Sequence, residues 1–212
     1  MTKFLEHPLE VKQRLSMRKT LKRELEERRY EHTLRVEETA VQLAMAHNVD
    51  PSHSATAALL HDCAKNYKQE KMARLCERYH IELSMDELLN NDLVHAKVGA
   101  VVAREKYLVS HPDVLNAIRY HTTGRPHMTP LDKVIFVADY IEPGRKPHGR
   151  MEEIRKLAFH DLNTSLLMIL EDKIGYLLTK EKQIDQITIE TYKHLSGKEI
   201  HNESEFEHLR EA

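Results

Sequence analysis

Adjacent histidine and aspartate residues sit in the middle of one of the most apolar segments of the chain. The segment AALLHDCAK carries His61 and Asp62 inside a run that is apolar on every side at helical spacing. Such a run is typical of a helix that is buried all round. A buried carboxylate costs several kcal/mol unless something compensates its charge. A bound cation would compensate Asp62, and it would require further ligands elsewhere in the chain.

Further inward-facing candidates lie on four other predicted helices, each on the apolar face at helical spacing. These residues are His32, His95, His121 and Asp139. One such histidine alone is more often a hydrogen-bonded core residue than a ligand. Four inward histidines together with two inward carboxylates are better explained by metal binding. We expect the remaining eleven of the 15 histidines to be surface residues.

The types of these side chains indicate which metals they could bind. Imidazoles mixed with carboxylates suit borderline first-row ions such as iron, manganese or zinc, rather than calcium or magnesium alone. Six ligands are more than one catalytic ion needs, which favours two divalent metal ions. The two oxygens of Asp62 could bridge ions about 3.5–4 Å apart, the separation typical of two-metal hydrolases.

The elements that must position these residues are helices, because strand-like alternation is nearly absent from the sequence. Asp50-Pro51 and Thr129-Pro130 each combine an N-cap residue with proline at the first helical position. We therefore predict an all-α fold, a helical bundle in a single domain. The predicted helices span residues 10–29, 30–47, 51–65, 69–79, 85–90, 94–108, 112–121, 130–141, 150–179 and 186–196. We expect the polar C-terminal tail to pack loosely.

Composition excludes several other classes of protein. The chain has 212 residues and a formal net charge of -2, so no global basic field favours a long nucleic-acid partner. No run approaches the ~18–20 apolar residues of a membrane span. The two cysteines, Cys63 and Cys76, show no CxxC spacing and fit reduced thiols. We expect a cytoplasmic protein.

Four sequence blocks carry a family resemblance, and they occur in a fixed order. They are RRYEHTLRVEETA, ALLHDCAK, LVHAKVGAVVA and AIRYHTTGRPHMTPLDKVIFVADYIEPGR. They resemble the HD superfamily of metal-dependent phosphohydrolases, and more closely the bacterial YqeK family of symmetrical diadenosine tetraphosphate hydrolases. The likeness runs from about Arg28 to Arg145 and more weakly to about residue 195. We accordingly divide the chain into an N-terminal helical extension (1–27), an HD domain (28–197) and a polar tail (198–212).

The resemblance implies an activity and a set of metal ligands. The activity is cleavage of diadenosine tetraphosphate in the middle, giving two ADP, by a metal-activated hydroxide. One metal would be held by His32, His61, Asp62 and Asp139, and the second by Asp62, His95 and His121. The family's ions are described as iron.

Several residues near these ligands are candidates for catalysis and nucleotide binding. Asp62 and Lys65 are the expected catalytic residues, because Lys65 lies about one helical turn beyond His61 and could reach a phosphate oxygen. The expected nucleotide-binding residues are Arg29, Lys65, His95, His121, Thr123, Gly124 and Arg145, with Lys182, Gln183, Ile184, Asp185, Gln186 and Ile187 at the adenine edge. The last six rest on the resemblance alone. The family's usual Ala-Arg-Asn after Thr-Ile is replaced by Glu190-Thr191-Tyr192-Lys193, which could alter base specificity.

Two alternatives stay open at the level of sequence. The first is another nucleotide phosphohydrolase on the same scaffold, either a deoxynucleotidase or an alarmone hydrolase. The second is a metal- or nucleotide-binding regulatory protein without turnover, which predicts a closed ligand shell. Lys65 and the TTGR segment argue against the second alternative, because a structural site has no use for phosphate-binding groups. A homodimer is a further expectation.

Overall fold

The computed structural model describes residues 8–199 and 203–209, and within them the chain forms eleven α-helices, one 3-10 helix and no strand. The helices are α1 (Pro8–Glu24), α2 (Glu27–Ala46), α3 (Pro51–Leu60), α4 (Gln69–Arg78), α5 (Met85–Leu89), α6 (Asn91–Tyr107), α7 (Pro112–Arg119), α8 (Pro130–Ile141), α9 (Met151–Leu157), α10 (Leu162–Thr179), α11 (Gln186–Ser196) and η1 (Glu203–Leu209). The all-α prediction is confirmed. No helix in these described ranges is long and apolar enough to cross a membrane.

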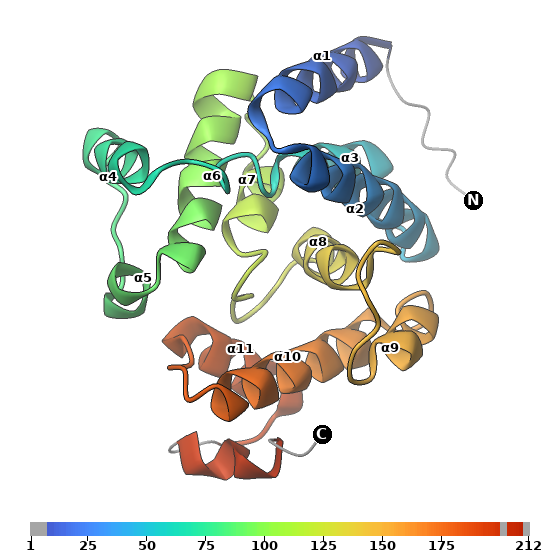
Figure 1. Cartoon of the computed structure of the whole chain (residues 1–212). Helices are drawn as coiled ribbons and strands as arrows, with labels where there is room; N and C mark the ends of the chain where they lie inside the picture. The colour runs from blue at the N-terminus through green and yellow to red at the C-terminus, as the bar shows by residue number, and fades with distance from the viewer. Residues whose placement is uncertain (1–7, 200–202, 210–212) are drawn as a thin grey trace.

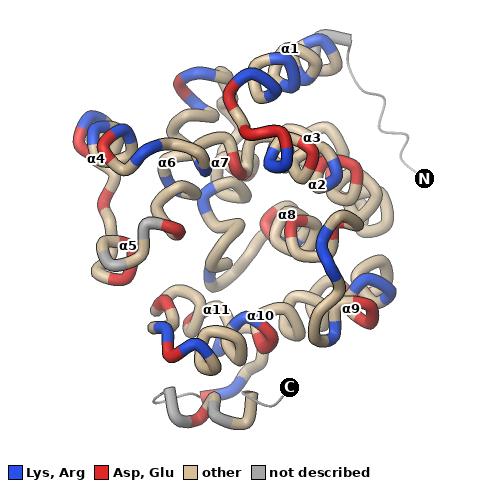
Figure 2. The backbone as a smooth tube through the Cα atoms, in the orientation of Figure 1, with Lys and Arg blue, Asp and Glu red and all other residues tan. Residues whose placement is uncertain are grey.

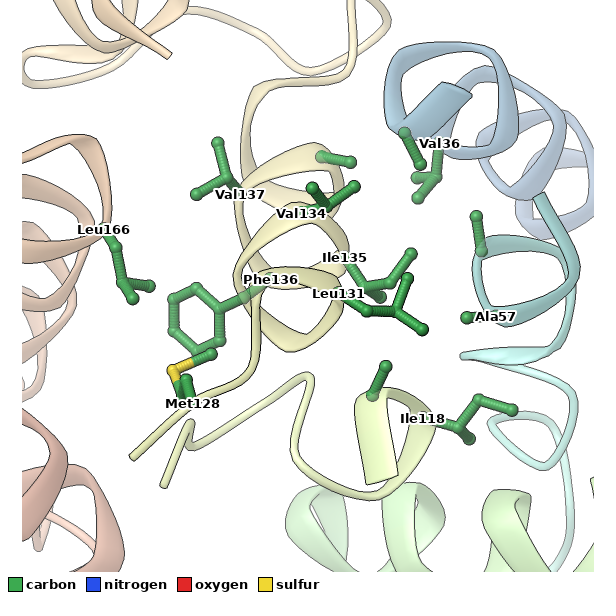
Figure 3. Close-up of a cluster of buried hydrophobic side chains, with 14 of the residues drawn as sticks. Val36, Ala57, Ile118, Met128, Leu131, Val134, Ile135, Phe136, Val137 and Leu166 are labelled. Carbon is green, nitrogen blue, oxygen red and sulfur yellow. The ribbon is translucent and has the colours of Figure 1, made fainter. Parts of the chain in front are cut away.

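Helix α8 lies at the centre of the arrangement (Figure 1), with α2, α3 and α7 packed on one side and α10 on the other. Its sequence LDKVIFVADYI is apolar on nearly all faces because both sides are covered. Figure 3 shows Phe136 directed toward Leu166 of α10, while Ile135 is directed toward Ala57 of α3. The position of α8 therefore brings Asp139, near its C-terminal end, next to the helices that carry the histidines.

Side-chain caps fix where the site-bearing helices begin. The Asp50 carboxylate accepts hydrogen bonds from the backbone N–H groups of Ser52 and His53 at the start of α3. Thr129 and Asp132 form a reciprocal capping box at the start of α8. Each such cap is worth about 1 kcal/mol. Both helix starts predicted from the sequence are confirmed.

The HD pair differs from expectation, because α3 ends at Leu60 and residues 61–66 form consecutive turns. The backbone N–H of Cys63 bonds to the Leu60 carbonyl (3.1 Å), and that of Lys65 bonds to the Asp62 carbonyl (3.0 Å). Neighbouring residues on a regular α-helix point about 100° apart. Leaving the helix allows both His61 and Asp62 to be buried against the other candidates.

Two further expectations about the second half of the chain are wrong. The predicted helix over 150–179 is interrupted, because the Asp161 side chain caps a new helix by accepting from the backbone N–H groups of Asn163 and Thr164. The tail is not loosely packed over η1, where Phe206 is fully buried and its ring meets that of Tyr192 edge-on at 5.3 Å. Residues 1–7, 200–202 and 210–212, which include His7 and His201, lie outside the described part.

Candidate metal centre

Six side chains from five separate parts of the chain converge in the interior. His32 comes from the second turn of α2, and His95 comes from the second turn of α6. The others lie at or just after helix C-termini: His61 and Asp62 after α3, His121 after α7, and Asp139 in the last turn of α8. The histidines and Asp62 are at most 7 % exposed, while Asp139 is partly open to solvent. The structure therefore brings together all six residues predicted as ligands.

The two carboxylate oxygens of Asp62 face two different groups of histidines. Its Oδ2 lies 3.4 Å from His61 Nε2 and 3.9 Å from His32 Nε2. Its Oδ1 lies 3.1 Å from His95 Nε2 and 3.7 Å from His121 Nε2. Each group forms a triad whose ligand atoms all lie within 4.8 Å of one another. We call His32–His61–Asp62 the first triad and Asp62–His95–His121 the second triad.

Asp139 lies beside the first triad. Its Oδ1 is 3.1 Å from His32 Nε2 and 3.8 Å from His61 Nε2. Burial raises the pKa of the Asp139 carboxyl, but the Arg145 guanidinium and the two imidazoles outweigh burial and hold that pKa well below its usual range. Asp139 is therefore an anion that can add a fourth ligand on the first triad's side.

Backbone carbonyls fix the orientation of three of the imidazoles. The Nδ1 atoms of His61, His95 and His121 lie 2.6, 2.6 and 2.7 Å from the carbonyl oxygens of Ala58, Asp92 and Ile118 respectively. A carbonyl accepts only, so each Nδ1 carries the hydrogen. Each Nε2 is then left as a lone pair directed at the triads, which is the arrangement metal-binding histidines adopt.

Unsatisfied lone pairs provide the test of whether these residues fit metal ions. The Nε2 atoms of His95 and His121 are 3.2 Å apart, although neither has a hydrogen left to donate. Burial lowers the pKa of His121 to about 4, so that ring is neutral near pH 7. In the described residues, the buried Nε2 atoms of His32 and His61 have no hydrogen-bond partner. Cations between these atoms would satisfy all four, so the donor set fits metal.

Glu142 supports the first triad and was missed by the sequence reasoning. It is buried, and its Oε1 accepts a hydrogen bond from His32 Nδ1 at 3.1 Å. Its Oε2 accepts from Arg35 Nε and from the Gly144 backbone N–H, both at 2.6 Å. Burial raises the pKa of Glu142, but these bonds outweigh burial and lower that pKa. Its position could have identified it, because Glu142 lies three residues after Asp139, directly after the end of α8.

Three basic side chains border the triads. Lys65 Nζ lies 3.4 Å from His95 Nδ1 and 3.3 Å from the exposed Asp92 carboxylate. Arg29 Nη1 lies 2.7 Å from Asp62 Oδ2, and Arg145 Nη2 lies 2.6 Å from Asp139 Oδ1. The predicted phosphate contacts Arg29, Lys65 and Arg145 are therefore at the edge of the cluster.

The TTGR segment forms a tight turn directly after His121. Gly124 has a left-handed φ of +70°, and a Cβ there would lie 2.7 Å from Thr191 Cγ2. The buried Thr123 hydroxyl donates to the Gly124 carbonyl at 2.9 Å. Lys173 of α10, which sequence reasoning also missed, donates to the Thr122 carbonyl at 2.5 Å, and burial lowers its pKa to about 8. The turn is thus held between α10 and α11.

The candidate adenine-edge segment 182–187 forms the turn before α11. Asp185 caps α11 by accepting from the backbone N–H groups of Ile187 and Thr188, and the Ile184 side chain is buried. Gln183 Nε2 donates to Asp86 of α5 at 2.7 Å, and the Gln186 backbone N–H donates to the same carboxylate at 3.0 Å. The structure ties this segment to α5, and it leaves the Lys182 side chain exposed.

The fold and the cluster together define a class: an all-helical protein with histidine–aspartate triads suited to two metal ions. A model of the HD domain matches residues 29–144, which contain all six converging residues. The chain belongs to the HD-domain family. The resemblance carried by its four sequence blocks is thereby confirmed.

Named relatives agree with this assignment. The chain is 41 % identical over 177 residues to "Bis(5'-nucleosyl)-tetraphosphatase, symmetrical" of Halalkalibacterium halodurans, covering 82 % of this chain and 92 % of the relative. It is 41 % identical over 172 residues to the protein of that name from Bacillus subtilis, covering 81 % and 91 %. A crystal structure from Clostridium acetobutylicum, titled a predicted HD superfamily hydrolase involved in NAD metabolism, is 40 % identical with a TM-score of 0.83. The match covers 87 % of this chain and 97 % of that one.

Proposed function

We propose that this chain is a metal-dependent hydrolase that cleaves diadenosine tetraphosphate symmetrically to two ADP. The observation that carries the proposal is Asp62, whose two oxygens each face a different histidine pair. The names of relatives that match nearly their whole length support the choice of substrate. One water is consumed: a P–O bond in the middle of the tetraphosphate breaks, and each half leaves as ADP.

The metal ions, when bound, supply an activated water near neutral pH and positive charge against the polyphosphate. Asp62 would contribute to both metal positions, while His32, His61 and Asp139 would hold one ion and His95 and His121 the other. The backbone bonds to Nδ1 keep the imidazoles from rotating, so their lone pairs are preorganised.

The basic residues at the edge of the cluster orient the polyphosphate. Lys65, Arg29 and Arg145 offer charge-assisted hydrogen bonds to phosphate oxygens as negative charge shifts toward the leaving ADP. ADP is a good leaving group, so a strong general acid is not required. We assign the adenine edge to residues 182–187 and the TTGR turn, with Thr123 and Gly124 beside it.

We propose that the metal is iron. Manganese and zinc are the alternatives, because they prefer similar donor atoms. The histidine–carboxylate donor set supports a borderline first-row ion. Metal analysis of protein purified without oxygen tests this choice. A protein that retains only calcium or magnesium under these conditions would contradict it.

The domain boundaries, the location and the oligomeric state of this chain are also proposals. We propose that the chain divides into an N-terminal helical extension (1–27), an HD phosphohydrolase domain (28–197) and a polar C-terminal tail (198–212). Cys63 and Cys76 are both free thiols, which supports a reducing, cytoplasmic location. The expected homodimer is measurable by light scattering of the purified chain.

Product identification tests the proposed activity. The metal-loaded protein is offered a panel of dinucleoside polyphosphates, deoxynucleotides and alarmones, and its products are resolved by chromatography. We expect ADP as the single product from diadenosine tetraphosphate. Preferred turnover of a deoxynucleotide or an alarmone would favour another phosphohydrolase, and metal binding without any hydrolysis would favour a regulatory protein.

A further inference from the structure

A cavity opens beside the first triad, and His32 is part of its lining. It has a volume of about 560 Å³ and extends from His32 between the start of α2 and the loop that joins α8 to α9. A volume of this size is within the range of small-molecule sites. The cavity reaches a candidate metal ligand directly, so whatever occupies it also touches the cluster.

The lining of this cavity is strongly basic. Arg28, Arg29 and Arg35 come from α2, and Arg145 and Lys146 come from the loop after α8. Figure 2 shows basic segments at the start of α2 and again in that loop. Two carboxylates also line it, Glu26 and Glu142. Glu142 pairs with Arg35 and accepts a hydrogen bond from His32, and five cations against two carboxylates leave the lining with a net positive charge.

Arg28 and Lys146 are the two cations of the cavity that the fold does not use. Both side chains are exposed, and within the described ranges neither takes part in an ion pair or side-chain hydrogen bond. Arg29, Arg35 and Arg145, in contrast, each pair with a carboxylate. Cations without a partner on a concave surface are suited to binding an anion, and phosphate groups fit arginine and lysine well.

An aromatic ring belongs to the lining of the same cavity. His148 lines it, and its ring packs edge-on against Tyr140 at 5.4 Å. The Tyr140 hydroxyl donates to Asp172 at 3.1 Å, and Arg150 holds the same carboxylate at 2.8 Å. The His148 ring is therefore supported from behind by an anchored tyrosine, and flat rings of this kind can stack with nucleobases.

A substrate with two nucleoside diphosphate halves needs two binding regions, one on each side of the cleaved bond. The proposed adenine-edge segment 182–187 can accommodate one half, and it is tied to Asp86 of α5. The loop after α8 lies on the α9 side (Figure 1). The basic cavity is thus separate from the first nucleotide region, and its lining includes His32 of the first triad.

We propose that this cavity holds the second nucleoside diphosphate half of the substrate, with Arg28 and Lys146 on its phosphates and His148 beside its base. The proposal rests on the proposed function, because it assumes a substrate with two nucleoside diphosphate halves. None of these three residues was among the expected catalytic, metal-binding or nucleotide-binding residues.

The test counts ADP molecules bound to the metal-loaded protein by isothermal titration calorimetry. We expect two ADP per chain for the wild type and one for the double variant Arg28→Ala/Lys146→Ala. In the double variant the KM for diadenosine tetraphosphate should rise about tenfold or more, as expected when charge-assisted hydrogen bonds to phosphate are removed.

His148→Ala should weaken the binding of the second ADP while leaving the binding of inorganic pyrophosphate unchanged. The matched control is Arg23→Ala/Lys156→Ala, which removes exposed cations that do not line the cavity.

The outcomes separate this inference from the proposed function. Cleavage of diadenosine tetraphosphate by a wild type that binds one ADP per chain would overturn the inference and leave the function standing. Two ADP of unchanged affinity in the double variant would also overturn it. A wild type that cleaves no dinucleotide would remove the proposed function itself. Circular dichroism of each variant identifies any that fails to fold, and the charge-reversed variant Lys146→Glu then repeats the measurement.

Discussion

Replacing Asp62 by asparagine tests the shared position of this residue most directly. Asparagine keeps the shape of the side chain, so the turn after α3 should form as before. Its neutral amide removes the negative charge from Oδ2, which faces His61 and His32, and from Oδ1, which faces His95 and His121. One substitution therefore weakens both metal positions at once.

The magnitude follows from the charge that the substitution removes on each side of Asp62. A charge-assisted interaction contributes ~1.5–3 kcal/mol, so removing one toward each metal position costs ~3–6 kcal/mol. Each increase of about 1.4 kcal/mol in the activation free energy lowers the rate tenfold. The rate should therefore fall a hundredfold or more. We expect at least a hundredfold lower cleavage of diadenosine tetraphosphate, together with depleted metal.

The assay combines metal analysis, product chromatography and thermal unfolding of Asp62→Asn beside the wild type. Asp113→Asn is the matched control, because Asp113 is exposed in the first turn of α7 and lies outside both triads. The control should keep its metal and activity. Wild-type metal content and wild-type cleavage in Asp62→Asn would refute the shared ligand and the two-metal mechanism with it.

Three other variants probe the surroundings of the triads. Lys65→Ala should lower kcat tenfold to a hundredfold in steady-state assays, with metal content and melting temperature nearly unchanged, because it removes one hydrogen bond to phosphate; full activity would make Lys65 a surface charge. Glu142→Gln should weaken metal binding tenfold to a hundredfold in chelator competition, and unchanged affinity would contradict its supporting role. Gly124→Ala should destabilise the fold by about 1–3 kcal/mol more in urea unfolding than Gly197→Ala, since both have positive φ but only Gly124 has a neighbour within 4 Å of an added Cβ. Equal losses in the two glycine variants would exclude the clash.

Local sequence signals predicted most of the helices and the inward direction of the six converging side chains. Caps such as Asp50 and Thr129 act within four residues, so their effect is visible in the sequence alone. The break at Asp161 carries the same kind of signal, but the apolar spacing on both sides of it suggested one continuous helix. Local signals therefore predicted helix boundaries correctly where one signal dominated. They failed at Asp161, where the capping residue and the apolar periodicity disagreed.

Pairings between distant residues explain what the sequence could not predict. Glu142 meets His32 across 110 positions, and Lys173 meets the carbonyl of Thr122 across 51. The burial of Phe206 depends on Tyr192 being on the facing side of α11. No local pattern encodes these pairings, because they depend on how the helices pack. The basic cavity is likewise formed by residues 26–35, Asn66 and residues 142–148, which are far apart in the sequence.

The placement of the six converging residues at helix ends has an electrostatic consequence of its own. Helices α3, α7 and α8 finish next to the cluster, and a helix C-terminus carries about half a negative charge from its aligned peptide dipoles. Helices α2 and α6 begin near the same place, and their N-termini carry the opposite partial charge. The backbone thus favours cations beside the ends of α3, α7 and α8 and anions beside the starts of α2 and α6, by about 0.3–1 kcal/mol for each helix. Side-chain substitutions leave these backbone dipoles intact. A protein with this fold but with different ligand residues would therefore still attract metal ions and phosphate groups to the same helix ends.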